Sequence, residues 1–256
     1  MPVPATAATK LPIIEIFSSV QGEGILVGRR QIFLRLAGCN LNCDYCDTQF
    51  TATVQCQIEQ PPGSEKFIAW SNPVGLEQIG CLLTHWLDRS PELLNSHHSI
   101  SITGGEPLLH APQLINWLPV LARLLPLQLE TNGTLCDELA MLLPWLRWVI
   151  MDFKLESQTG TVTPWSEHRK FLALASQVNC CVKVVVGNNT DKAELEQVAQ
   201  IVASTAAYVP VILQPRTVDN RCSVPAAKLL EWQALVANCN LDVRVIPQTH
   251  CYLAML

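Results

Sequence analysis

The stretch QIFLRLAGCNLNCDYC, residues 31–46, decides the fold. Its first six residues are mostly apolar and indicate a buried strand. Cys39, Cys43 and Cys46 follow that strand. Three thiolates spaced four and three residues apart can converge from one loop onto a metal cluster. Because functional residues of α/β folds gather where strands end, this loop predicts a site at the carboxyl edge of a sheet.

The same kind of apolar run returns along the chain, and segments with a helical period separate the runs. Further strands are expected at residues 98–103, 127–131, 148–154, 181–186, 209–214 and 242–246. Helices are expected at residues 75–87, 112–125, 167–176, 192–203 and 226–237. This alternation, repeated about six times, predicts an α/β fold with a parallel sheet and covering helices. We expect a single domain over residues 1–256, with a flexible tail at 1–12 and an inserted surface loop at 52–75.

Composition narrows the class of protein. The chain has 256 residues, 49% of them hydrophobic and 15% charged, which can fill a large core and excludes a disordered chain. The net charge of −5, without a block of Lys or Arg, argues against binding to nucleic acid. No apolar run reaches eighteen residues, so no contact with a membrane is expected. Because the first twelve residues do not resemble a secretory signal, we expect the cytoplasm.

The eleven cysteines are unevenly placed. Without a secretory signal, the tight group of three indicates metal or redox chemistry, and the other eight are expected to be small buried apolar residues. An iron–sulfur cluster held by three thiolates keeps one iron open to a ligand. A remote cysteine could instead complete a four-ligand zinc site, so zinc stays open at this point.

A second motif, TGGEP at residues 103–107, ends a predicted strand. Gly104 and Gly105 allow a ligand to approach the backbone closely, and Glu106 can accept hydrogen bonds from an amine.

Together, the CxxxCxxC loop and the GGEP segment resemble the radical S-adenosylmethionine (SAM) enzymes. In that family the three cysteines hold a [4Fe–4S] cluster, the open iron binds SAM, and reductive cleavage of SAM gives a 5′-deoxyadenosyl radical. Other segments narrow the resemblance: EIFSSVQGEG at 15–24, Arg35 before the cysteines, Asp47 and Thr48 after them, and PQTH at 247–250. This combination is similar to the 7-carboxy-7-deazaguanine synthase family. The resemblance implies a partial (β/α) barrel of about six parallel strands.

The resemblance also implies a reaction. The substrate would be 6-carboxy-5,6,7,8-tetrahydropterin, which contracts to 7-carboxy-7-deazaguanine with loss of ammonia, in queuosine and deazapurine biosynthesis. The implied cofactors are a [4Fe–4S] cluster, SAM and Mg²⁺. The implied partners are an electron donor such as flavodoxin or ferredoxin, and a second copy of the chain in a homodimer.

The family motifs assign site residues by position, and the cluster cysteines Cys39, Cys43 and Cys46 are the only residues expected to take part in radical formation. The expected substrate-binding residues are Val20, Gln21, Gly22, Glu23, Arg35, Thr103 and His250. The expected SAM-binding residues are Gly105, Glu106, Asn132, Asp152, Phe153, Lys154, Gln214 and Pro215. Thr48 offers a hard oxygen to Mg²⁺, and the planar guanidinium of Arg35 matches a carboxylate. Asp152 and Phe153 stand where many members have Ser-Pro, which leaves their side-chain roles open.

Two alternatives remain at this stage. One is a radical SAM enzyme that activates a partner protein by forming a glycyl radical on it. The other is a non-catalytic zinc-binding protein. An iron–sulfur protein absorbs visible light and a zinc protein does not, so anaerobic purification separates them.

Overall fold

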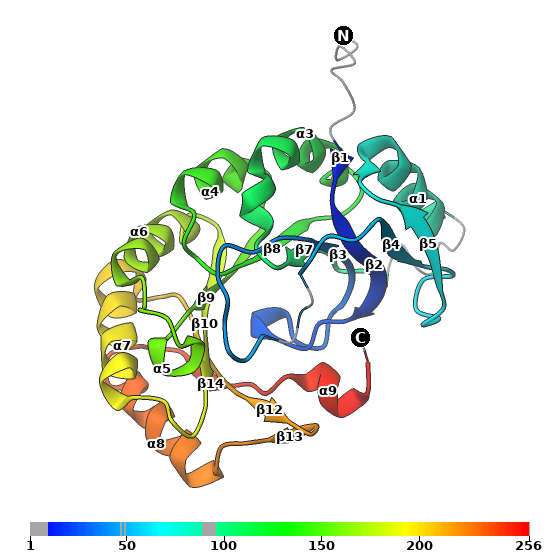
Figure 1. Ribbon diagram of the computed structural model, residues 1–256. Helices are drawn as coiled ribbons and strands as arrows, with labels where there is room; N and C mark the ends of the chain where they lie inside the picture. The colour runs from blue at the N-terminus through cyan, green and yellow to red at the C-terminus, as the bar shows by residue number, and fades with distance from the viewer. Residues whose placement is uncertain (1–9, 47, 49, 89–95, 256) are drawn as a thin grey trace.

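A curved sheet of ten strands organises the chain (Figure 1). The computed structural model describes residues 10–46, 48, 50–88 and 96–255. Seven adjacent strands pair in parallel. In spatial order they are β3 (Arg30–Leu36), β7 (Ser99–Gly104), β8 (Leu127–Thr131), β9 (Trp148–Phe153), β10 (Asn179–Val186), β11 (Val211–Pro215) and β14 (Val243–Val245). Each overlaps a predicted strand, which confirms the α/β fold with a mostly parallel sheet.

The longer helices lie along the outer side of this sheet (Figure 1). They are α1 (Leu76–Asp88), α3 (Ala111–Leu121), α4 (Cys136–Leu142), α6 (Trp165–Ala175), α7 (Lys192–Ala206) and α8 (Ala226–Ala237). In α3, Leu114, Trp117 and Leu118 are fully buried, as expected for a helix whose apolar face covers strands. The Asp191 carboxylate caps α7 by accepting a hydrogen bond from the Ala193 amide. The sequence did not predict α4, which is only seven residues long.

The sequence predicts a surface loop at residues 52–75, but the structure of this segment is different. It contains the antiparallel strands β4 (Gln55–Glu59) and β5 (Phe67–Ser71) at one edge of the sheet, and then β6 (Val74–Gly75). The reason is that Cys56, Ile58 and Glu59 are buried although the segment is polar overall. The carboxylate of Glu59 accepts hydrogen bonds from the amides of Ser18, Gly63 and Glu65, which secures the hairpin.

The beginning of the chain is also more ordered than expected where it is described. Within the predicted tail, β1 (Lys10–Leu11) pairs with β6, and Leu11 is fully buried. Residues 1–9 lie outside the described part of the chain. β2 (Ile13–Val20) then runs antiparallel to β3, with Glu15 opposite Arg35.

Short elements lie inside the curve of the sheet and at its open side. They are the 3-10 helix at Gly24–Leu26, the helices α5 (Glu156–Thr159) and α9 (Thr249–Leu253), and the hairpin of β12 (Thr217–Val218) and β13 (Arg221–Cys222). Further 3-10 turns lie at Pro107–His110 and Leu143–Trp145. In the described part of the chain, none of the helices has the length and apolar character needed to span a membrane.

Candidate active site

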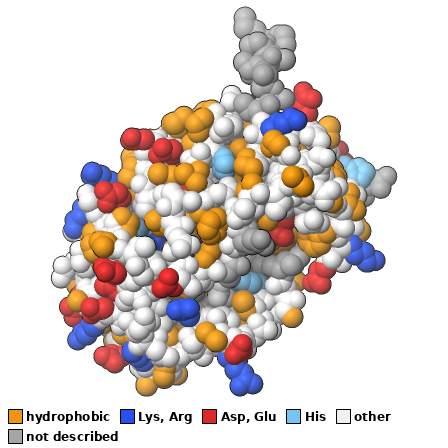
Figure 2. All heavy atoms as spheres, in the orientation of Figure 1, with side chains coloured by type: hydrophobic (Ala, Val, Ile, Leu, Met, Phe, Trp, Pro, Cys, Tyr) orange, Lys and Arg blue, Asp and Glu red, His pale blue; other side chains and the backbone are white. Residues whose placement is uncertain are grey.

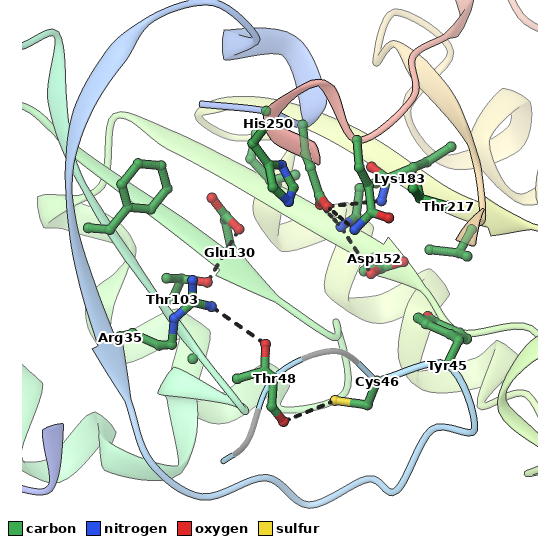
Figure 3. A pocket seen from close by; sticks show the side chains of 18 of the residues that line it. Arg35, Tyr45, Cys46, Thr48, Thr103, Glu130, Asp152, Lys183, Thr217 and His250 are labelled. Atoms are coloured by element: carbon green, nitrogen blue, oxygen red, sulfur yellow. Dashed lines mark hydrogen bonds and ion pairs between the residues drawn. The ribbon is translucent and has the colours of Figure 1, made fainter. Parts of the chain in front are cut away.

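A cavity of about 740 Å³ lies inside the curve of the sheet, where the parallel strands end. Its size is typical of small-molecule sites. Figure 3 shows Arg35, Thr103 and Glu130 on one side and Asp152, Lys183 and Tyr45 on the other. Cys46 and Thr48 come from the loop after β3, and His250 reaches in from α9. On the face of the molecule shown in Figure 2, the Lys and Arg side chains are dispersed and do not form one basic patch.

Cys39, Cys43 and Cys46 all line this cavity, and none is in a disulfide. The Cys46 amide donates to the Cys43 carbonyl at 3.1 Å, which makes a tight turn between two of the thiols. Burial raises the pKa of the Cys39 and Cys43 thiols. Within the described residues, no three His, Cys, Asp or Glu side chains already form a group that could hold a metal ion. The donor set of three soft thiols facing one cavity fits an iron–sulfur cluster, in which each cysteine binds a different iron.

Gly104 and Gly105 explain how this loop is held beside the strand ends. A Cβ atom on Gly104 would lie 2.1 Å from the Leu36 carbonyl oxygen, and one on Gly105 would lie 2.1 Å from the Gly38 carbonyl oxygen. Gly104 also has a φ of +140°, which side chains disfavour. The glycine pair therefore permits close packing of the end of β7 against the cysteine loop.

A row of alternating charges crosses the cavity from the cysteine loop to the turn at residues 21–24. Lys154 Nζ donates to the Tyr45 hydroxyl at 2.9 Å and to Asp152 Oδ2 at 2.7 Å. Lys183 Nζ lies 3.4 Å from Asp152 Oδ2 and forms a close ion pair with Glu23. Burial alone disfavours the charged forms, but the neighbouring carboxylates hold the pKa of Lys154 and Lys183 above the usual value.

Glu23 is the point where several distant segments meet. Its Oε1 accepts hydrogen bonds from the side-chain amides of Gln214 and Gln248, both at 3.0 Å. Burial raises the pKa of Glu23, but the nearby Lys183 ammonium outweighs that effect and holds it at about 2. Glu23 is therefore a carboxylate, and it links the turn after β2 to β11 and to the C-terminal segment.

His250 lies directly against Gly22. A Cβ atom on Gly22 would be 2.1 Å from His250 Nδ1, and the Thr249 amide donates to the Gly22 carbonyl at 3.0 Å. The absence of a side chain at position 22 thus allows the PQTH segment to reach the cavity.

Arg35 faces the cavity but already has an anionic partner. Its Nε donates to Glu15 Oε1 at 2.7 Å across the β2–β3 pair, and its Nη1 lies 3.5 Å from Thr48 Oγ1. The guanidinium also lies 5.7 Å from the centre of the Phe17 ring. Arg35 therefore has a carboxylate partner within the protein, and its guanidinium still lines the cavity beside Thr48.

Gln21 lines the cavity with its side-chain amide engaged by protein groups. Its Nε2 donates to Gln31 at 2.8 Å and to Glu130 Oε1 at 2.7 Å, and its Oε1 accepts from the Glu23 amide. Ser101 and Gln128 also donate to Glu130 Oε1. Thr103 donates to Glu130 Oε2 at 3.3 Å. Gln21 and Thr103 therefore orient the Glu130 carboxylate, a residue that the sequence did not assign.

Three of the predicted SAM residues do not line the cavity. They are Glu106, Phe153 and Pro215. Glu106 is fully buried and accepts hydrogen bonds from the Leu108 and Asn132 amides and the Thr131 hydroxyl. Burial raises its pKa to about 7, against the effect of these donors. The Phe153 ring packs against buried His168, at 4.5 Å between ring centres.

The other predicted residues do line the cavity. They are Val20, Gln21, Gly22, Glu23, Arg35, Thr48, Thr103, Gly105, Asn132, Asp152, Lys154, Gln214 and His250, together with the three cysteines. Sequence reasoning missed Tyr45, Glu130, Lys183, Thr217 and Gln248, which line it as well. One signal was available for Lys183, because a lysine inside the apolar run CVKVVV is unusual.

Three buried polar atoms on one side of the cavity have no hydrogen-bond partner in the described structure: Asp152 Oδ1, Gln214 Oε1 and Thr217 Oγ1. Buried oxygens without partners are costly, so these atoms indicate the place of a polar ligand.

Comparison with known proteins shows the family to which this chain belongs. The chain is 43% identical to a 7-carboxy-7-deazaguanine synthase of Geobacter sulfurreducens, over 94% of this chain and 96% of the relative. The chain belongs to the 7-carboxy-7-deazaguanine synthase family. It is also 34% identical to a synthase of Methanothermobacter thermautotrophicus, over 94% and 96% of the two chains. No protein-family model matches the chain.

Two solved structures have folds similar to the fold of this chain. QueE of Escherichia coli matches with a TM-score of 0.56 and 24% identity, over 94% of this chain and 95% of that one. SuiB of Streptococcus suis, solved with S-adenosylmethionine, matches with a TM-score of 0.54 over 81% of this chain and 44% of SuiB. As a member of the 7-carboxy-7-deazaguanine synthase family, the chain is a radical SAM enzyme, with SAM and a [4Fe–4S] cluster as its cofactors. Neither a glycyl-radical-activating enzyme nor a zinc protein is among the relatives named here.

Proposed function

We propose that this chain contracts 6-carboxy-5,6,7,8-tetrahydropterin to 7-carboxy-7-deazaguanine with release of ammonia. One observation carries the proposal: the three cysteines share a single cavity with Glu23, Arg35 and His250. These groups come from opposite ends of the chain, and together they suit a small, flat, anionic substrate held next to a radical source. A glycyl-radical-activating enzyme would need to admit a loop of a partner protein.

The substrate carboxylate is assigned to Arg35. With Nε bound to Glu15, the remaining edge of the guanidinium faces the cavity beside Thr48. This places the substrate carboxylate on the side of the cavity nearest to the cysteine loop. The hydrogen to be removed is on the carbon that bears this carboxylate, so Arg35 holds that carbon towards the radical source. Glu23 is assigned to the N–H edge of the pyrimidine ring, and His250 covers the substrate.

The SAM side of the cavity is assigned to the ends of β9 and β11. Asp152 Oδ1 and Gln214 Oε1 can accept hydrogen bonds from two neighbouring hydroxyl groups, as a ribose would offer, and Thr217 lies close along the chain. Asn132 and the Gly105 backbone complete this side. When bound, the cluster supplies the electron that cleaves SAM. Glu106 contributes indirectly, since it holds the Asn132 amide at 2.7 Å.

Mg²⁺ is proposed to bind between the substrate carboxylate and Thr48. A hydroxyl is a weak ligand, so substrate oxygens and water have to complete the shell. We predict that Mg²⁺ raises turnover and that Thr48→Ala weakens this dependence; activity that is indifferent to chelators and to Mg²⁺ would contradict the assignment.

The homodimer, the flavodoxin or ferredoxin donor and the cytoplasmic location also stay predictions.

Anaerobic incubation with SAM, a reductant and the carboxypterin, followed by mass analysis, tests the proposed function. We expect 7-carboxy-7-deazaguanine, 5′-deoxyadenosine and methionine as products. SAM cleavage without any deazaguanine product would show that the radical chemistry is present but the substrate is wrong.

A further inference from the structure

Lys183 is a charged residue in the middle of a buried strand. Its neighbours Val182 and Val184 are fully buried, and β10 lies between β9 and β11 near the centre of the parallel strands. The side chain points into the cavity, where it is 12% exposed (Figure 3). A buried ammonium is costly unless it is paired, so its partners explain why it is there.

The two partners of Lys183 depend on it to different degrees. Asp152 Oδ2 also accepts a hydrogen bond from Lys154 Nζ at 2.7 Å, so Asp152 keeps a cation without Lys183. Glu23 also accepts hydrogen bonds from the side-chain amides of Gln214 and Gln248, which are neutral. Lys183 is therefore chiefly the counter-ion of Glu23.

We infer that Lys183 is a positioning residue for the substrate, which keeps Glu23 an oriented carboxylate that can accept hydrogen bonds from an N–H edge. The inference rests on the proposed function, because the pyrimidine ring of the pterin offers such an edge through its ring N–H and amino group. A carboxylate with an acceptor site left on Oε2 can accept a hydrogen bond from this edge, whereas a protonated carboxyl group presents a donor to it.

The charges around Glu23 support this role. Lys183 faces it from β10 and His250 from α9, while Asp152 at the end of β9, Lys154 just after that strand and Glu130 on β8 are the other charged groups near Lys183. Burial raises the pKa of Glu23, and Lys183 is the main group that lowers it. Without Lys183, Glu23 would take up a proton more easily, and the substrate would meet the wrong hydrogen-bonding partner.

Anaerobic titrations with carboxypterin and with SAM, between pH 6 and pH 9, test the inference on the cluster-loaded enzyme. The single variants are Lys183→Met, which removes the charge, Lys183→Arg, which keeps it, and Glu23→Gln. The double variant combines Lys183→Met with Glu23→Gln. At pH 6 we expect Lys183→Met to bind pterin at least tenfold more weakly than wild type and SAM within about threefold. This loss should shrink as the pH rises and Glu23 ionises.

The other variants show whether Lys183 acts through Glu23. Lys183→Arg should bind pterin within about threefold of wild type. Adding Lys183→Met to Glu23→Gln should change pterin binding by less than about threefold, because the carboxylate is already gone. Cluster absorbance and circular dichroism check folding; if Lys183→Met does not fold, Lys183→Gln takes its place.

Three results would overturn the inference: equal losses of pterin and SAM binding, a loss that does not change with pH, or full additivity in the double variant. A wild type that does not bind the pterin would instead refute the proposed function, and the inference would fall with it. The wild-type titration therefore separates the two failures.

Discussion

Each cluster cysteine has a role that no neighbouring residue can take over. Cys39, Cys43 and Cys46 face the cavity, and a cluster that loses one of them lacks a ligand. We expect an Ala substitution at any of the three to abolish SAM cleavage, measured as 5′-deoxyadenosine formed under anaerobic conditions. Full activity in any one of these variants would show that the assignment is wrong.

Other cysteines provide the controls for this experiment. Cys81 and Cys239 are exposed and Cys136 is half-buried, all outside the cavity lining, so Ala variants there should keep the visible absorbance of the cluster. Cys251 is a sharper control because it does line the cavity. If Cys251→Ala lost the cluster while the other controls kept it, a four-cysteine site would be indicated.

Arg35 illustrates how a residue can serve both structure and binding. Truncating one partner of a buried charged pair typically costs about 2–5 kcal/mol. At about 1.4 kcal/mol per tenfold, Arg35→Ala should weaken pterin binding by a factor of tens to thousands, and SAM binding should survive. Arg35→Lys should rescue binding only partly, because an ammonium lacks the planar fork. Separate titrations with the two ligands measure this.

Glu15 supplies the matched control, because Arg35→Ala also leaves Glu15 without its partner. Glu15→Gln removes the charge of the pair but keeps Arg35 in the cavity. We expect Glu15→Gln to weaken pterin binding much less than Arg35→Ala does. Comparable losses in both variants, or equal losses of both ligands in Arg35→Ala, would mean that the pair is only structural.

At the scale of elements, the contact between the turn at residues 21–24 and α9 decides whether the site is complete. Gly22→Ala would place a Cβ atom 2.1 Å from His250 Nδ1, so the PQTH segment would have to move away. We expect at least a tenfold loss of pterin affinity, with SAM affinity and the cluster preserved. Gly80→Ala on α1 is the control, because nothing lies within 4 Å of a Cβ there. Wild-type pterin binding by Gly22→Ala would place His250 outside the substrate site.

At the scale of the whole molecule, buried His168 makes stability depend on pH. Burial lowers its pKa from 6.5 to about 4, so the folded protein keeps His168 neutral where the unfolded chain takes up a proton. Between these values the unfolded state binds more protons, and stability therefore falls as the pH falls from 6.5 towards 4. The shift corresponds to about 3 kcal/mol at 1.36 kcal/mol per unit.

A comparison with His168→Gln isolates this contribution, because other titrating groups cancel in the difference. Denaturant unfolding at pH 7.5 and at pH 4.5 should show the wild type losing stability relative to the variant by a few kcal/mol. Gln can still donate a hydrogen bond to the Asn132 carbonyl, which His168 Nε2 contacts at 3.2 Å. An unchanged difference between the two pH values would mean that His168 takes up a proton as readily in the folded protein as in the unfolded chain.

The sequence by itself determined the parallel sheet and the position of the cysteine loop. Apolar runs such as residues 31–36 and 181–186 are local signals, and the spacing of Cys39, Cys43 and Cys46 is readable without knowing any distant contact. The family motifs likewise placed Glu23, Arg35 and Lys154 at the cavity. The hairpin of β4 and β5 was missed because Glu59 looks polar in sequence, and only the fold surrounds it with amides.

Only the tertiary structure decided which side chains each of these groups meets. Lys183 is 160 positions from Glu23 and Gln248 is 225 positions from it, yet both side chains donate hydrogen bonds to the Glu23 carboxylate. The sequence suggested that Glu106 accepts a hydrogen bond from an amine, but in the fold its carboxylate accepts one from the Asn132 amide. The sequence matched Arg35 to a substrate carboxylate, and only the pairing of β2 with β3 shows that Glu15 also binds it. The physical reason is that charge pairing and burial depend on distance in space, and that distance is set by how the strands pair across the sheet rather than by the order of residues.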